Sequence, residues 1–218
     1  MKSLFDGPEA TEFLSKGLSL LMKKADRGCI LLGVSMLDDE LNKLFKSLIP
    51  KDTSNKKIKE IFDLNGPFGT LSAKTNIAYV CNILPKDVVE SIHKLRKLRN
   101  NLAHRTDPFS IKENFESISQ VFSMLEGDID KGLLHMSGEL VYGRFLSDML
   151  EMDSPIDGEK KVFNSPEEVV SYIKDKNEIG ETLMSNRIKL MFVIGVSVLA
   201  ALIHIHKDRV IRKLHAQS

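Results

Sequence analysis

The stretch LMFVIGVSVLAALIHI, residues 190–205, decides the fold class of this chain. It carries no charged side chain apart from one histidine that can titrate, and it is 16 residues long. A helix that spans a bilayer needs about 20 apolar residues, and basic residues flank this stretch on both sides, so neither end is marked as cytoplasmic. A helix buried between other helices gives the same signal. We therefore predict that residues 190–205 form the core of a long C-terminal helix, and we do not expect a membrane span.

The composition of the whole chain supports a helical fold. The chain has 218 residues, of which 42% are hydrophobic, with no tryptophan and only three tyrosines. Strand-favouring aromatic residues are scarce and good helix formers are abundant. The length fits one domain or one domain with an insertion. We predict a single all-α helical bundle over residues 1–218.

Apolar residues recur every three or four positions along most of the chain, which predicts amphipathic helices. Asp26 is expected to cap the second helix, and either Thr70 or Ser72 is expected to cap the fourth. Residues 127–165 are the least regular and are interpreted as an insertion that carries one short helix. The predicted helices lie at about 9–24, 26–48, 58–62, 72–81, 87–104, 111–125, 140–149, 166–174 and 183–214.

The charge and the cysteines limit the kinds of function. The formal net charge is +1, whereas DNA-binding domains are usually clearly basic because they neutralise phosphates. Direct DNA binding is therefore not expected. Cys29 and Cys81 lie in apolar helical stretches and are predicted to be buried, reduced thiols. The cysteines and histidines show no metal-ligand spacing, so neither a metal nor another cofactor is predicted.

Three separated segments of the chain resemble a known family. They are RGCILLGVSMLDDELNKLF (27–45), GPFGTLSAKTNIAYVCNIL (66–84) leading into LRKLRNNLAHR (95–105), and the long C-terminal helix. Their order, and the Gly-Pro-x-Gly-x-Leu-Ser break before a helix, resemble the mannitol operon repressor (MltR-like) family. The resemblance implies an all-helical transcriptional regulator without a recognisable helix-turn-helix. It also implies that the C-terminal apolar helix belongs to the domain core.

The segment from Arg99 to His104 also resembles the Arg-x4-His motif of HEPN domains, which are small helical bundles and often dimers. Some HEPN proteins are metal-independent ribonucleases of toxin–antitoxin and phage-defence systems. In that interpretation His104 would either help to remove the proton of a ribose 2′-hydroxyl or donate a proton to the leaving oxygen. Arg99 would stabilise the charge that develops on the phosphorus centre, and Asn100 would orient the histidine or the phosphate.

A helical wheel places Arg99 inside the apolar stripe of its own helix. An arginine directed at a core is costly unless a carboxylate pairs with it, so we expect a partner. Asp38 is the first choice and Glu40 the second, because they flank the apolar stripe of the second helix. A pair that only fixes helix packing is favoured over one that prepares Arg99 for phosphate. The other face of the Arg99 helix is basic and carries His93, Arg96 and Lys97.

The leading hypothesis from the sequence is a cytoplasmic, non-enzymatic transcriptional regulator. It would act through a protein partner and as a homodimer, using helix faces rather than a catalytic pocket. The alternative hypothesis is a HEPN-type RNase toxin or defence effector, which would bind RNA and use Arg99, Asn100 and His104 without a metal.

Overall fold

The computed structural model of the chain describes residues 8–103, 107, 109–158 and 160–216. These residues form nine α-helices and no named strand, with one isolated bridge between Asp153 and Lys161. The predicted all-α class is confirmed. The helices are α1 (Pro8–Leu21), α2 (Asp26–Ser47), α3 (Asn55–Phe62), α4 (Leu71–Val80), α5 (Lys86–Ala103), α6 (Phe115–Phe122), α7 (Ile129–Leu150), α8 (Pro166–Ile173) and α9 (Asn177–His215).

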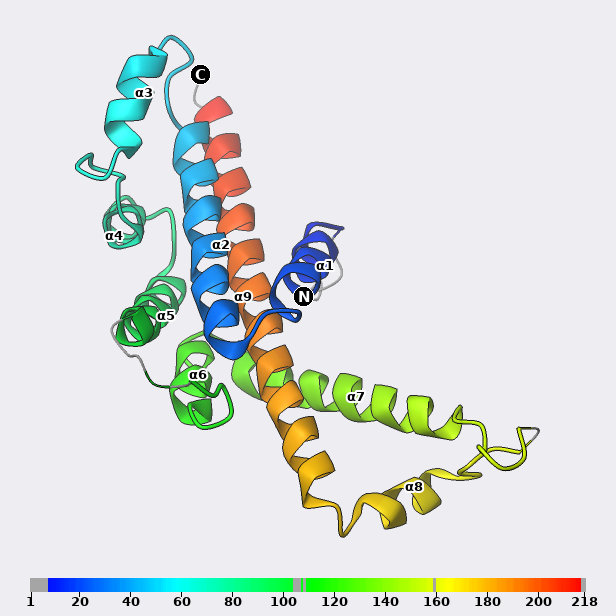
Figure 1. Cartoon of the computed structure of the whole chain (residues 1–218). Coiled ribbons are helices and arrows are strands. Elements are labelled where there is room, and N and C mark those ends of the chain that lie inside the picture. The colour runs from blue at the N-terminus through cyan, green and yellow to red at the C-terminus, as the bar shows by residue number, and fades with distance from the viewer. Residues whose placement is uncertain (1–7, 104–106, 108, 159, 217–218) are drawn as a thin grey trace.

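Helix α9 is the centre of the fold. It packs against α1, α2 and α7 and touches α5, α6 and α8 as well, and Figure 1 shows α2 lying alongside it. Every residue from 190 to 203 except Leu202 is buried, which confirms the predicted core helix. The helix begins six residues earlier than predicted, at Asn177. Glu178 lies in its first turn, where a carboxylate is favoured by the exposed N–H groups.

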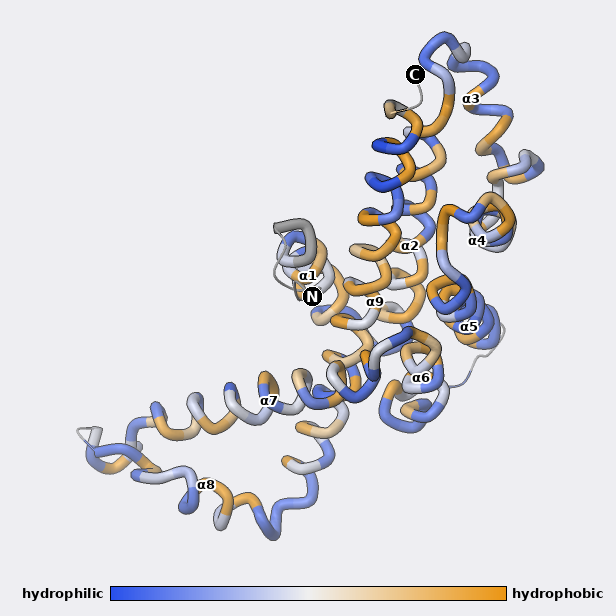
Figure 2. Tube along the Cα trace, turned by 180° about the vertical axis from the view of Figure 1, so that it is seen from behind, coloured by the Kyte–Doolittle hydropathy of each residue, from blue (hydrophilic) through white to orange (hydrophobic). Residues whose placement is uncertain are grey.

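The same helix satisfies the length and composition required to cross a membrane. Over Asn177–Leu214 it is long and apolar enough, and 78% of its most apolar window is buried inside the structure. Figure 2 shows this hydrophobic middle of α9 surrounded by α1, α2 and α6. Because α9 contacts these helices, its apolar face is covered by protein, as expected for a core helix.

Helices α3 to α6 follow one another along the outer side of α2 (Figure 1). Helix α5 packs on both α2 and α4, and α6 packs on α5. The apolar stripe predicted for α5 is confirmed, because Val88, Ile92, Leu95 and Leu102 are all buried. This arrangement places the C-terminal half of α5, which carries Arg99, against α2 and next to the first turn of α4.

Helices α7 and α8 and the first turns of α9 project from the rest of the molecule (Figures 1 and 2). We call α7, α8 and residues 177–190 the arm. The prediction of one short helix at 140–149 was wrong, because α7 has 22 residues and begins at Ile129. Its Gly132 and Gly143 meet no other atoms within 4 Å of an added Cβ. They lower helix propensity without marking a turn, so the glycines made a continuous helix look irregular.

Two smaller predictions about helix ends also need correction. Asp26 does not cap α2: it is the first helical residue, and the N-cap is Ala25 without a side-chain bond. The Asp26 carboxylate instead accepts a hydrogen bond from the Ile111 amide at 2.9 Å and lies 3.7 Å from Lys189 Nζ. The helix predicted from residue 111 begins only at Phe115. Thr70 caps α4 as expected, accepting from the Ala73 amide at 3.1 Å.

The two cysteines differ in environment. Cys29 is fully buried on α2, as predicted, but Cys81 at the C-cap of α4 is exposed. The apolar run before Cys81 ends with α4, so the thiol lies past the buried part of that helix. Burial raises the pKa of the Cys29 thiol to about 12.

This difference predicts selective alkylation. Iodoacetamide at pH 8 should label native protein once, at Cys81, because the reactive species is the thiolate and Cys29 remains protonated and covered. Denatured protein should take two labels, as read by intact mass. The Cys81→Ser variant should take none while native. Rapid double labelling of the native protein would show that α2 is not packed as described.

Candidate functional site

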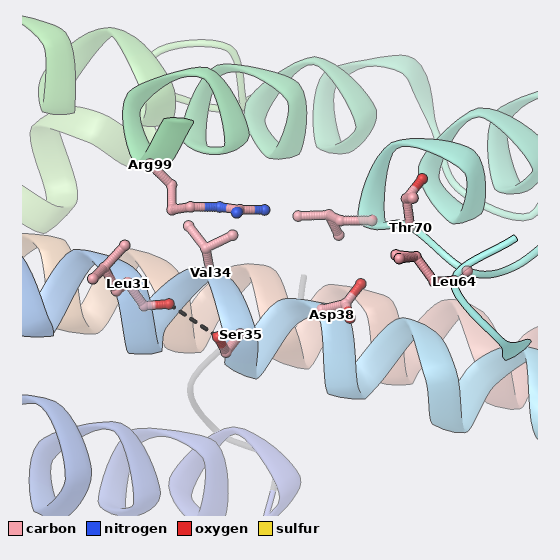
Figure 3. A pocket seen from close by; sticks show the side chains of 9 residues that line it. Leu31, Val34, Ser35, Asp38, Leu64, Thr70 and Arg99 are labelled. Carbon is pink, nitrogen blue, oxygen red and sulfur yellow. Dashed lines mark hydrogen bonds between the residues drawn. The ribbon is translucent and has the colours of Figure 1, made fainter. Parts of the chain in front are cut away.

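Arg99 points into a cavity formed by α2, α4 and α5. The cavity has a volume of about 330 Å³, and Figure 3 shows the extended Arg99 side chain above Val34, with its guanidinium directed toward the side where Thr70 and Asp38 lie. We call this cavity the Arg99 pocket. It is lined by Leu31, Val34, Ser35, Asp38, Leu64, Gly69, Thr70, Leu71 and Arg99.

The predicted ion pair between Arg99 and Asp38 is wrong, although both residues line the pocket. The Asp38 carboxylate is taken by Lys74 of α4, whose Nζ lies 2.6 Å from Asp38 Oδ1. The contact is an ion pair rather than an aligned hydrogen bond. Lys74 is only 2% exposed and also donates to Asn42 Oδ1 at 2.8 Å. The carboxylate therefore neutralises a buried lysine and is not free for the arginine.

The second choice of partner, Glu40, is also engaged elsewhere. It is buried on α2 and lies 2.6 Å from Lys43 Nζ and 4.0 Å from Lys16 Nζ. Among the described residues, no hydrogen bond or ion pair of Arg99 is found. Arg99 is half-buried, and its guanidinium has no partner in the described part of the chain.

The loop before α4 shapes one wall of the pocket. A Cβ on Gly66 would lie 2.3 Å from the Glu60 carbonyl oxygen, and one on Gly69 would lie 2.2 Å from the Asp63 carbonyl oxygen. Both glycines are therefore needed where the loop passes closely over the end of α3. This packing accounts for the Gly-Pro-x-Gly break as a structural turn.

The opposite face of α5 carries the predicted basic residues. Lys97 is exposed, whereas His93, Arg96 and Asn100 are half-buried. Burial, and then the Arg96 guanidinium, hold the pKa of His93 below its usual value, so His93 is neutral at pH 7 and adds no positive charge. Lys97 lines a shallow cavity of about 220 Å³ facing α6. Helix α5 thus separates Lys97 from Arg99, which faces α2 and α4.

His104, the third member of the Arg-x4-His motif, lies outside the described residues. The structure therefore gives no distance from His104 to Arg99 or Asn100. The RNase interpretation stays a prediction. Among the described residues, no group of three or more His, Cys, Asp or Glu side chains is placed to hold a metal ion.

A second surface, which the sequence did not single out, lies on the arm. An open groove of about 680 Å³ runs between α7, α1 and α9. Its walls are mostly apolar, and its charged residues Arg144 and Asp148 lie one turn apart on α7, with Nε and Oδ2 separated by 3.7 Å. The groove is lined by Leu18, Met22, Leu140, Val141, Arg144, Phe145, Asp148, Leu183, Asn186 and Leu190.

Sequence reasoning missed Lys74 and the arm for two different reasons. Lys74 reads as an ordinary solvated lysine in a short helix, and only the crossing of α2 and α4 buries it. The arm was hidden because its glycines suggested irregular structure. An apolar spacing of Leu140, Val141 and Phe145 was nevertheless present and predicts one continuous helical face.

Comparisons with known proteins give one result. No family model matches the sequence, and no curated protein matches it. Among solved structures, the chain is similar to MtlR in the X-ray structure of the MtlR–HPr complex from Escherichia coli. The two chains are 17% identical, the match covers 87% of this chain and 99% of that one, and the TM-score is 0.47. MtlR is a mannitol operon repressor, the kind of protein that the three sequence segments resemble. At this level of similarity, neither the functional residues nor the partner of that protein can be assigned to this chain.

Proposed function

We propose that this protein is a cytoplasmic transcriptional regulator that acts through protein contacts, and that it works as a homodimer. The segments that resemble the mannitol operon repressor family support the regulatory role and its link to sugar-alcohol genes. The near-neutral net charge supports regulation without direct DNA binding. The single observation that carries the protein-contact part of the proposal is the uncovered apolar surface of the arm.

The arm carries several large apolar side chains that the rest of the described chain leaves exposed. Leu140 of α7, Val170 and Tyr172 of α8, and Met184 of α9 are each between 39% and 54% exposed. They belong to a projection (Figure 2) whose helices α7 and α8 pack mainly on α9, with α6 also touching α7. Exposed apolar side chains on such a projection favour a surface that another protein covers.

The charges of α7 favour a second copy of this chain as the occupant of the arm groove. Leu140, Arg144 and Asp148 lie four residues apart and share one face of α7. When two α7 helices pack antiparallel about a two-fold axis near residue 146, Arg144 of each copy lies opposite Asp148 of the other. Leu140, on the same face, is nearly half exposed. The face is therefore self-complementary, as a two-fold interface requires.

The regulatory proposal is tested by transcript measurements in a strain that lacks the gene. Deletion should raise the transcripts of a defined operon, with the mannitol genes as the first ones to inspect, and wild-type protein should restore repression. Leu140→Arg should fail to restore it, because a charge on the arm groove weakens association at least about tenfold. Val80→Arg places the same change on an exposed apolar residue of α4 and should restore repression. Unchanged transcripts, or full repression by Leu140→Arg, would refute the proposal.

A further inference from the structure

The Arg99 pocket contains one positive charge that no described residue neutralises. The guanidinium of Arg99 is directed into the cavity (Figure 3) and has no hydrogen bond or ion pair among the described residues. Among the described residues of the lining, the only other charged one is Asp38, whose carboxylate is 2.6 Å from Lys74 Nζ. The Arg99 nitrogens are not among the buried unpaired polar atoms, so the guanidinium faces the open cavity, where an anion can reach it. The pocket therefore holds a cation without a counter-charge among the described residues.

The size and walls of the pocket limit what can complete it. Its volume of about 330 Å³ lies at the lower end of the range for small-molecule sites. Leu31, Val34 and Leu71 give it apolar walls, while Thr70 adds a hydroxyl group. Thr70 Oγ1 already accepts from the Ala73 amide, which leaves the hydroxyl proton available to a ligand oxygen.

We propose that the Arg99 pocket binds a small organic oxyanion, a phosphate ester or a carboxylate carried on a short apolar or hydroxylated body. The guanidinium of Arg99 receives the anion through two parallel N–H bonds, the geometry that distinguishes arginine from lysine. The body of the ligand lies along Val34 and Leu71. This site is separate from the arm, and it does not depend on the proposed homodimer.

Asp38 does not exclude an anion from this pocket. Its charge is balanced by Lys74, and the pair is held in place by Asn42 at 2.8 Å from Lys74 Nζ. Counting Arg99 with this pair leaves one net positive charge. Asp38 also keeps an exposed side, about one-third of its side chain, that can accept a hydrogen bond from a ligand hydroxyl. A hydroxylated body is therefore compatible with the same pocket.

Isothermal titration of the full chain tests the proposal with four probes: inorganic phosphate, butyl phosphate, butyrate and butanol. Butyl phosphate is expected to bind most tightly, because it combines an apolar body with an anion of up to two charges and three acceptor oxygens. Inorganic phosphate lacks the body and butyrate has a single charge, so both should bind more weakly, and butanol should not bind measurably. Comparison of butyl phosphate with butyrate decides between a phosphate ester and a carboxylate as the preferred ligand. Absence of binding by both anions would overturn the proposal.

Three variants localise the binding. Arg99→Met should lower the affinity for the tighter-binding of butyl phosphate and butyrate about ten- to hundredfold, as loss of charge-assisted hydrogen bonds does. The melting temperature of this variant should stay at or above that of wild type. Ser35→Phe keeps the arginine but places an aromatic ring at the pocket wall, and it should lower the affinity for the same probe. Lys97→Met removes a charge from the other face of α5 and should bind as wild type does. Wild-type affinity in Arg99→Met, or equal loss in Lys97→Met, would refute the site.

Discussion

Asp38→Leu is expected to destabilise the protein by about 3–5 kcal/mol, although Asp38 is one-third exposed. The cost arises at Lys74, which is 2% exposed and loses the only counter-charge that the described residues place within 4 Å of it. The amide oxygen of Asn42 remains as its hydrogen-bond acceptor among these residues. A buried ammonium group without a counter-charge must draw water into the contact between α2 and α4. The free energy of unfolding, measured by urea titration, reports this loss directly.

Lys74→Met is the matched control for this prediction. It removes the buried charge and replaces it with an apolar side chain of similar length. Asp38 is then the charge that is left unpaired, and its one-third exposed side chain can be hydrated, unlike a buried ammonium. We expect Lys74→Met to lower the free energy of unfolding by no more than about 1 kcal/mol, less than Asp38→Leu does. Equal losses of stability in Asp38→Leu and Lys74→Met would contradict the difference in burial between Asp38 and Lys74.

Gly195→Val is expected to destabilise the protein by about 3 kcal/mol. Gly195 lies in the buried middle of α9, and a Cβ there would meet ring carbons of Phe122 at 2.4 Å. Phe122 is itself fully buried on α6, so its ring has no free space to move into. The clash therefore outweighs the small gain in helix propensity over glycine, which is below about 1 kcal/mol. Thermal and urea unfolding measure the loss.

Two controls separate the clash from a general effect on the helix. Gly180→Val lies in the same helix, where an added Cβ meets nothing within 4 Å, and should change stability by less than about 0.5 kcal/mol. Phe122→Ala opens space beside Gly195, so the double variant should be more stable than the two separate losses predict, by about 0.5–3 kcal/mol. Simple additivity would show that α6 and α9 do not meet at this point.

The core of the fold was predictable because its signal is local. The run at 190–205 contains no fixed charge and becomes the buried middle of α9, and the stripe of Val88, Ile92 and Leu95 becomes the buried face of α5. The helical wheel placed Arg99 inside the apolar stripe of its helix, and in the structure it is half-buried. These properties follow from the spacing of apolar residues along a single helix.

The partners of charged residues were not predictable, because they depend on how helices cross. Asp38 and Glu40 were correctly placed at the sides of the α2 stripe, but the stripe does not specify which neighbour reaches them. Lys74 reaches Asp38 from α4, and Lys43 reaches Glu40 from the same helix. A lysine in a short helix gives no sequence signal that it will be buried. Among the described residues, Arg99 is therefore left without a carboxylate partner.

The proposed homodimer through the arm is tested most directly by molecular mass in solution, measured by light scattering after size exclusion. Wild-type protein should have twice the 24.5 kDa mass of one chain. Arg144→Glu should be monomeric at the same concentration, because it places two carboxylates opposite each other at each of two symmetry-related contacts. The swap Arg144→Glu with Asp148→Arg should restore the dimer. A monomeric wild type, or a dimer that persists in both Arg144→Glu and the swapped variant, would contradict the proposal.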